Sequence, residues 1–536
     1  MRTIIPLVLS LLALPLFAQH DHDAAAPRPV TLDAGLGNAH MSVSTKNAEA
    51  QKYFDQGLRY VYAFNHEEAV RSFAKAGELD PDLAMSWWGV ALALGPNINM
   101  DVDPDREKQA YEAVQTAAAK SASPKERDLI AALQKRYTND TSADLHKLAE
   151  EYSGAMGSLS KKYADDADIA TLYAESLMDL HPWKFWAHDG TPAPGTEEIV
   201  RVLEGVLKKH PNHMGANHYL IHAVEASPHP ERAAEAAVRL ETLAPAAGHL
   251  VHMPAHVFQR TGNYLGAARA NENGAVADRA YIQVAGNGGM YPTMYYNHNL
   301  QFGSASYAMI GRYADAKRMG DEFAANAAML AKDLPPVEFA TAWPQLVALR
   351  SGRWLDVIRM KPSDAGPLST ALSHFARGVA YAKVGNILGA QSEQKDFEAA
   401  RAALGDDVGF MQNTPRHLGE LASHVLAAHI TEAAGAGNDA IAHFEQAVTV
   451  EDALNYNEPA DWPWPARESL GAALLRAGRN ADAERVFRED LRHNPHNPRS
   501  LYGLASALRA QKKDAASAER EWKKRWQGGT LTLAQF

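Results

Sequence analysis

The chain has 536 residues, a net formal charge of −11 and no cysteine. An acidic chain without a long basic run is not expected to bind nucleic acid. The absence of cysteine excludes disulfides, thiolate metal ligands and cysteine nucleophiles.

The start of the chain is typical of a secretory signal. Arg2 gives a positive charge, residues 4–17 form a short apolar run, and Ala18 is a small residue at its end. The run is shorter than the about 20 apolar residues that cross a bilayer, and no later segment is long enough. We therefore expect a signal peptide over 1–18, a periplasmic or secreted protein, and no membrane insertion. Residues 19–45 are rich in Ala, Pro, Asp and His and are predicted to form a disordered polar tail.

Residues 50–83 have the spacing of a helix pair. Positions 4, 8, 11, 20, 24, 27 and 32 of this stretch hold Tyr53, Gly57, Tyr60, Ala69, Phe73, Ala76 and Pro81. Small residues let two antiparallel helices approach, aromatic residues fill the space between neighbouring pairs, and the proline ends the second helix. The pattern resembles the tetratricopeptide repeat (TPR), a 34-residue helix–turn–helix unit. Together with the apolar start, it suggests an exported bacterial TPR protein.

The pattern returns, with varying quality, over most of residues 50–525. We therefore expect an all-α, right-handed α-solenoid of about ten to twelve helix pairs, each burying its face against its neighbours. Helix content should be near or above about 60%, with negligible strand. The array divides into N-terminal repeats over 46–213, central repeats over 214–330 and C-terminal repeats over 331–530.

Histidines gather at helical spacing in three central repeats that begin at 214, 248 and 297. Their groups are His218, His222 and Glu225 at positions 5, 9 and 12, then His249, His252 and His256 at positions 2, 5 and 9, then His298 at position 2. In the proteins that this chain resembles, positions 2, 5, 9 and 12 face the concave groove. The resemblance therefore implies that three consecutive repeats point imidazoles into one groove.

Histidines four residues apart lie on one side of a helix and can chelate one divalent ion. His218 with His222, and His252 with His256, are such pairs. His249 and His256 are two turns apart, about 10.5 Å along a helix axis, so one ion is not expected to take both. Either two metals bind, or the outer residues orient the ligands.

Pro254 interrupts the second group, because proline has no backbone N–H to donate to residue 250. We expect the helix to start near Met253 or to kink there. His249 and His252 would then lie on the entry turn.

Neutral imidazoles with one carboxylate suit copper, zinc or non-haem iron. Six histidines are enough for a copper pair with three ligands each, and Met214, Met253 and Met294 nearby also fit copper. Zinc hydrolysis fits too, with Glu225 as a ligand or general base. We expect one or two divalent or redox metal ions, with copper or zinc favoured over iron.

Aromatic connections are candidates for the walls of this site. The candidate substrate-binding residues are Trp183, Tyr295, Tyr296 and Asn299, and residues 456–464 form a third aromatic connection. The alternative is that these aromatic residues fill gaps between irregular repeats. No residue is assigned a catalytic role.

Two classes of function follow. The first is an exported metal-dependent enzyme, an oxidoreductase or a hydrolase, with a small-molecule or peptide ligand in the concave groove. The second is a periplasmic scaffold or peptide-binding module without catalysis. Six imidazoles favour the enzyme, because a peptide groove needs varied polar and apolar groups. The sequence has no His-Glu-x-x-His, phosphate-binding loop or dinucleotide fingerprint that would name the reaction.

Overall fold

The computed structural model describes residues 28–536 except 287, 333 and 407–411. The chain divides into a short unit, Met1–Thr31, and a large compact unit, Leu32–Phe536, which holds the helices described below. The predicted signal peptide over 1–18 lies outside the described residues.

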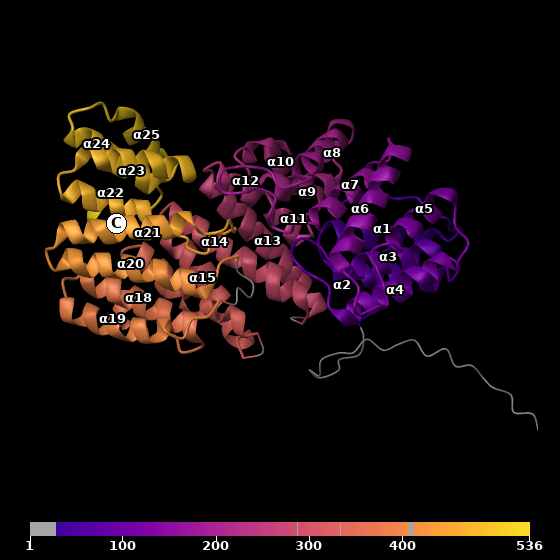
Figure 1. Cartoon of the computed structure of the whole chain (residues 1–536), viewed down its shortest axis with the longest axis horizontal. Helices are drawn as coiled ribbons and strands as arrows, with labels where there is room; N and C mark the ends of the chain where they lie inside the picture. Colours follow the sequence, from indigo (N-terminus) through magenta and orange to yellow (C-terminus); the bar gives the residue numbers. More distant parts are fainter. Residues whose placement is uncertain (1–27, 287, 333, 407–411) are drawn as a thin grey trace, which may run out of the picture. The chain divides into compact units, whose positions relative to one another are not determined.

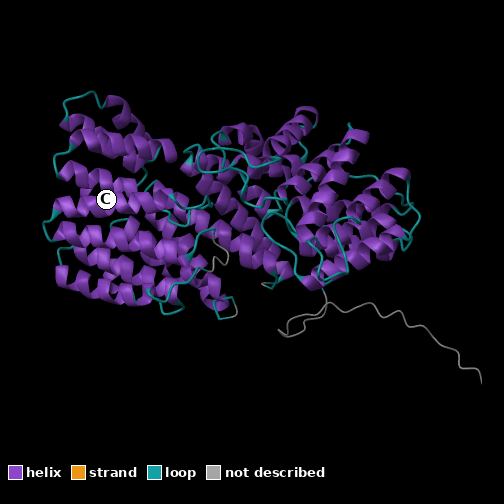
Figure 2. Cartoon of the chain, viewed as in Figure 1, coloured by secondary structure: helices purple, strands orange, loops and turns teal. Residues whose placement is uncertain are grey.

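Helices make up 69% of the described residues. Figure 2 shows them in purple, joined by loops in teal. In the same part of the chain there is no strand, only the isolated bridges Asn97 to Met100 and Trp186 to Pro192. The predicted all-α class is confirmed. No helix among the described residues is both long and apolar enough to cross a membrane.

The N-terminal repeats run as helix pairs (Figure 1). Polar side chains cap the starts of several of these helices. Asn47, Asp103, Asp144 and Asp166 accept backbone N–H groups at helix starts, and Ser123 forms a reciprocal capping box with Glu126. The helices are α1 Ala48–Tyr62, α2 His66–Leu79, α3 Ala84–Leu94, α4 Pro104–Ala118, α5 Pro124–Leu133, α6 Leu145–Lys162, α7 Ala167–Met178 and α8 Thr196–Lys209.

The central repeats contain two irregular helices beside regular ones. They comprise α9 Met214–Val224, the 3-10 helix η1 Pro230–Ala233, α10 Ala234–Leu243, α11 Gly248–His252, α12 Pro254–Arg260, α13 Tyr264–Ala285, the π-helix η2 Pro292–Tyr296, α14 Asn297–Met309 and α15 Tyr313–Leu330. The first helices of three repeats, namely α9, α11 with α12, and α14, carry the histidines.

The C-terminal repeats include two 3-10 helices, η3 Pro335–Ala342 and η4 Leu533–Gln535. Their α-helices are α16 Trp343–Arg350, α17 Trp354–Arg359, α18 Pro367–Lys383, α19 Ile387–Arg401, α20 Pro415–Ala433, α21 Gly437–Asp452, α22 Ala466–Arg476, α23 Asn480–His493, α24 Pro498–Ala510 and α25 Ala516–Arg525.

Close helix packing explains the small residues of the repeat pattern. A methyl group on Gly57 would lie 2.7 Å from the ring of Phe73, and one on Gly89 would lie 2.4 Å from the same ring. Phe487 has the same relation to glycines of its own repeat and the next. In both cases an aromatic residue on the second helix of a repeat packs between the first helix of the same repeat and the first helix of the next, where each has a glycine at the contact.

Part of the predicted polar tail packs on the helices. Leu36 and Met41 are buried, the Arg59 guanidinium donates to the Ala39 carbonyl, and the Ser44 backbone donates to Glu126 at 2.6 Å. Residues 32–45 therefore belong to the compact unit.

A buried ion cluster joins three C-terminal repeats. The Glu468 carboxylate of α22 accepts from Arg350 of α16 at 2.7 Å and from Arg499 of α24 at 2.7 Å. All three side chains are almost fully buried. Burial alone would raise the pKa of Glu468, but the two guanidinium groups outweigh it and lower the pKa to about 2.

Replacing Glu468 by Ala should destabilise the C-terminal repeats by about 3–5 kcal/mol, because two guanidinium groups would stay buried without their carboxylate. The contribution of Glu468 should be fully present above pH 4.5, its ordinary pKa, and should be lost as the pH falls towards 2. Thermal and urea unfolding at a series of pH values measures both effects.

Glu235→Ala is the control, since that carboxylate pairs with Arg239 on the surface with 83% of its side chain exposed. It should cost no more than about 0.5 kcal/mol. Equal losses for the two variants would show that the buried cluster does not hold the repeats together.

Candidate metal centre

Six histidines form two sets of three. The first set is His218, His222 and His249, and the second set is His252, His256 and His298. Within each set the three potential ligand atoms all lie within 4.8 Å of one another. The structure therefore brings all six predicted histidines together and divides them equally.

The two sets are built by the same rule. An i, i+4 pair, His218 with His222 or His252 with His256, is completed by a histidine from the first turn of the next repeat, His249 or His298. The ring centroids of His218 lie 4.9 Å from both partners, and those of His252 lie 4.7 Å from both partners. The repeat of the fold thus produces two sets of nearly equal shape.

Pro254 does not bend the chain out of its helical course. Met253, between α11 and α12, keeps helical angles of φ −50° and ψ −34°, and its N–H donates to the His249 carbonyl at 3.1 Å. The helical course therefore continues across the break, and Pro254 occupies the first position of α12, where no N–H is needed. His249, His252 and His256 remain on one side.

Two imidazoles are fixed by neutral acceptors at Nδ1. His218 Nδ1 donates to the Tyr62 carbonyl at 2.7 Å, and His252 Nδ1 donates to Asn271 Oδ1 at 2.8 Å. The Asn271 amide group in turn donates to the Ala267 carbonyl, which fixes its oxygen as the acceptor. Both rings therefore carry their proton on Nδ1 and direct an Nε2 lone pair inward.

Glu225 fixes one imidazole of each set. Its Oε1 accepts from His222 Nδ1 at 2.8 Å, and its Oε2 accepts from His256 Nδ1 in a short hydrogen bond. Glu225 is buried, which by itself raises its pKa, but His256 and His222 outweigh burial and hold the pKa well below its ordinary value. The carboxylate is therefore charged and has both oxygens engaged.

The inward nitrogens lie close together. His252 Nε2 and His256 Nε2 are 2.9 Å apart, and His218 Nε2 and His249 Nε2 are 3.1 Å apart. In the second set both Nδ1 atoms donate outward, so two Nε2 lone pairs face each other unless a cation lies between them. His222 Nε2 is buried and has no hydrogen-bond partner in the described residues. The second set therefore requires a shared proton or a metal ion. In the first set the buried His249 Nδ1 has no hydrogen-bond partner in the described residues, so His249 can carry its proton on Nε2 and donate to His218 Nε2.

The two sets differ in their preference for a proton. Burial lowers the pKa of His218, His222 and His249, so an added proton is disfavoured in the first set. Burial also opposes charge on His256, but the Glu225 carboxylate outweighs it and raises the pKa of His256. In the second set a proton competes with a metal.

Aromatic rings surround the first set. The Phe64 ring lies 4.5 Å from that of His218, the Tyr295 ring 4.5 Å from that of His249, and the Trp183 ring 6.0 Å from that of His222. Trp183 and Tyr295, both predicted to line the site, therefore contact imidazoles.

The other two predicted substrate-binding residues face different partners. The Tyr296 hydroxyl donates to Glu322, and its ring lies beneath the Arg279 guanidinium at 5.9 Å. Asn299 is buried and donates to Asp278 at 2.6 Å. These two residues support the helices behind the site.

One end of the aromatic connection 456–464 borders the histidines, and its other end fills a gap between repeats. The Tyr456 hydroxyl lies 3.4 Å from Glu225 and 3.1 Å from Glu458, so this end borders the histidines. Burial raises the pKa of Glu458 to about 7. Trp462 instead packs 5.3 Å from Phe375, where it fills a gap between C-terminal repeats.

The sequence did not indicate the residues that pack behind the histidines. Phe64 lies in the first repeat pair at a φ of 55°, and nothing in its local sequence relates it to residues near 218. Asn271 lies among Arg269, Glu272 and Asn273, so its local sequence does not mark it as a buried hydrogen-bond partner. Asp278 accepts from Tyr291, whose hydroxyl accepts from the His249 backbone at 3.0 Å.

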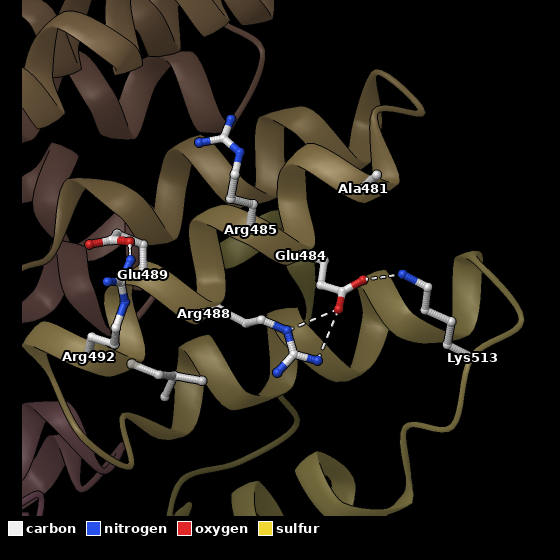
Figure 3. A pocket seen from close by; sticks show the side chains of 8 residues that line it. Ala481, Glu484, Arg485, Arg488, Glu489, Arg492 and Lys513 are labelled. Atoms are coloured by element: carbon white, nitrogen blue, oxygen red, sulfur yellow. Dashed lines mark hydrogen bonds and ion pairs between the residues drawn. The ribbon is translucent and has the colours of Figure 1, made fainter.

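A charged surface pocket lies elsewhere, along α23 (Figure 3). Glu484 accepts from Lys513 at 2.7 Å and from Arg488 at 3.0 Å, and Arg492 pairs with Glu489. The residues that line this pocket include no histidine, and its ion pairs satisfy one another. The histidine sets therefore remain the candidate site.

No protein-family model matches the chain, and no curated protein matches it. Solved structures give only weak superpositions. Human IFIT1 bound to m7Gppp-AAAA is 11% identical and has a TM-score of 0.33, covering 90% of this chain and 91% of that chain. Yeast Tom70 is 12% identical with a TM-score of 0.31, covering 89% and 99%. Cut9-Hcn1 of the APC/C is 13% identical with a TM-score of 0.30, covering 89% and 73%. Likeness at this level carries no argument about the site.

The backbone at the start of α11 leaves no room for a side chain at Gly248. A methyl group there would lie 1.9 Å from Asp278 Oδ1, the atom that accepts from Tyr291. Gly248→Ala should therefore displace Asp278 and lower stability by about 1–3 kcal/mol, although alanine favours a helix. Thermal unfolding followed by circular dichroism measures the change.

Gly205→Ala in α8 is the matched control, because nothing lies within 4 Å of the added methyl group. It should leave the protein as stable or raise its stability by up to about 1 kcal/mol. A stabilising Gly248→Ala would show that the Asp278 network does not constrain the start of α11.

Proposed function

We propose that this protein is a metal-dependent enzyme that holds two metal ions, one in each three-histidine set. The observation that carries the proposal is the orientation of the imidazoles. Four of the six, His218, His222, His252 and His256, are held at Nδ1 by a carbonyl, an amide or a carboxylate. Metal-binding histidines are typically held in this way, with the free nitrogen as ligand.

In this proposal Glu225 orients ligands and does not coordinate. Both of its oxygens already accept from imidazole Nδ1 atoms, one from each set. A carboxylate in this position makes the free imidazole nitrogens more basic, and so stronger metal ligands, and it prevents rotation of the rings. Each ion would then be bound by three neutral nitrogens, which leaves a position for substrate.

Copper or zinc fits three imidazoles, with iron as a third choice. With copper the reaction would be an oxidation or reduction, and with zinc a hydrolysis. The apolar start of the chain supports a periplasmic or secreted location, where we propose that the enzyme works.

A second candidate function is a peptide-binding module. The segment that ends at Phe536 packs among the C-terminal repeats, where Arg476 donates to the Leu533 carbonyl at 3.1 Å and Arg499 donates to the Gln535 carbonyl at 2.6 Å. Backbone contacts of this kind would also hold another extended peptide. In this alternative the histidines need no metal.

Metal content separates the two candidates. The purified protein, incubated with copper, zinc or iron and then dialysed, should retain about two ions per chain by elemental analysis. His222→Ala and His256→Ala should each lower this to about one, because a set with two histidines binds at least about 10- to 100-fold more weakly.

His429→Ala is the matched control, since His429 is a buried helical histidine outside both sets, packed 5.1 Å from Phe444. It should keep two ions. A wild-type protein that retains none of the three metals would contradict the enzyme and leave the peptide-binding module.

Metal loss on acidification should occur in two steps. Since a protonated imidazole cannot coordinate, the raised pKa of His256 should release the ion of the second set first. The lowered pKa values of His218, His222 and His249 should keep the first set loaded to a clearly lower pH. Elemental analysis after dialysis at successive pH values tests this, and loss of both ions in one step would contradict it.

A further inference from the structure

We infer that the two sets hold one coupled pair of copper ions and that the substrate of this pair is dioxygen. The inference rests on the proposed function and specifies the metal, the relation between the two ions and the substrate.

The facing sides of the two sets are close. The His222 ring lies 5.6 Å from that of His256, and the His249 ring lies 5.5 Å from that of His252. These separations fall within the range found inside a set, which runs from 4.7 Å between the rings of His252 and His256 to 5.9 Å between those of His222 and His249. Contacts between imidazoles therefore run without interruption from one set to the other.

Glu225 joins the sets across these facing sides. It contacts His222 of the first set and His256 of the second, the same two residues whose rings face each other at 5.6 Å. Both imidazoles are therefore positioned against one rigid group. Two ions bound there would share one environment and one orienting carboxylate.

Charge favours copper over zinc at such a pair. All six ligands are neutral, and Glu225 is the carboxylate in direct contact with them. Two divalent ions would bring four positive charges into a buried site, whereas two monovalent ions would bring two. Of the metals that suit imidazole, copper has a common monovalent state, so a reduced copper pair fits this site best.

Burial restricts the substrate to a small molecule. His218 and His252 are 0% exposed, and Phe64, Tyr295 and Phe302 pack against the imidazoles. Dioxygen is small, uncharged and able to accept two electrons, one from each ion. A single turnover is balanced as 2 Cu⁺ + O₂ + 2 H⁺ → 2 Cu²⁺ + H₂O₂. Each copper loses one electron to dioxygen, whose O=O double bond becomes an O–O single bond, and two O–H bonds form with protons from solvent.

The test loads the full chain with Cu⁺ under anaerobic conditions and then admits oxygen. We expect two copper ions per chain by elemental analysis and one hydrogen peroxide for every two copper ions. We also expect an electron paramagnetic resonance signal that accounts for much less than the total copper, because the spins of two adjacent Cu²⁺ ions pair through a shared oxygen ligand.

Two other results would overturn the inference in different ways. Two copper ions whose resonance signal accounts for all the copper would be independent, which overturns the coupled pair and leaves the proposed function standing. A protein that binds no copper overturns the inference, and if it binds no zinc or iron either, the proposed function fails with it.

His298→Ala is the variant that exposes coupling, because His298 is partly exposed and its loss should disturb packing least. It should retain about one copper ion, and the peroxide formed when oxygen is admitted should fall at least tenfold. After complete oxidation of the bound copper with added ferricyanide, its resonance signal should account for all the copper. His429→Ala should behave as the wild type. A His298→Ala protein of unchanged helix content that keeps two ions and full peroxide yield would contradict the inference.

Discussion

The hydrogen bonds at Nδ1 determine what the histidine sets can do. An isolated buried imidazole can carry its proton on either nitrogen, and it can turn. Here the Tyr62 carbonyl, the Asn271 amide and the Glu225 carboxylate fix the proton on the outer nitrogen of four rings. The inner nitrogens are then electron-rich, mutually close and buried. Such an arrangement is costly when empty and favourable around a cation, which is why the site indicates metal binding more strongly than six histidines alone.

The helical array supplies the rigidity that these hydrogen bonds need. Residues of the first repeat pair, the central repeats and the connection at 456–464 all meet at the site, although they lie far apart in the sequence. The acceptor for His218 is a carbonyl at the end of α1, and the Glu225 carboxylate lies beside Tyr456. Because each contact depends on the stacking of whole repeats, the site is as well fixed as the array itself.

The fold and the grouping of the histidines could be predicted from the sequence because both depend on short periods. The spacing of Gly57, Ala69 and Phe73 reflects contacts inside one helix pair or with the next, and His218 and His222 are four residues apart on one helix. The groups behind the ligands could not be predicted, because Phe64 and Tyr456 meet the histidines only after many repeats have stacked. The tail was predicted as disordered from its composition, yet Leu36 and Met41 are apolar enough to pack on the helices. The effect of Pro254 was also open, because the angles of Met253 decide whether a proline bends a helix or begins one.

The rule that builds each set is independent of this protein's particular residues. A histidine pair at positions 5 and 9 of one repeat, with a histidine at position 2 of the next, occurs twice in succession here, so the middle repeat serves both sets. The series stops because position 2 of the first repeat is Gly215, and positions 5 and 9 of the third are Gln301 and Ala305. Extending the three-position code to further repeats would place imidazoles in a row along the groove. An array of helical repeats extended in this way could hold a row of evenly spaced metal ions, with one further site for each repeat added.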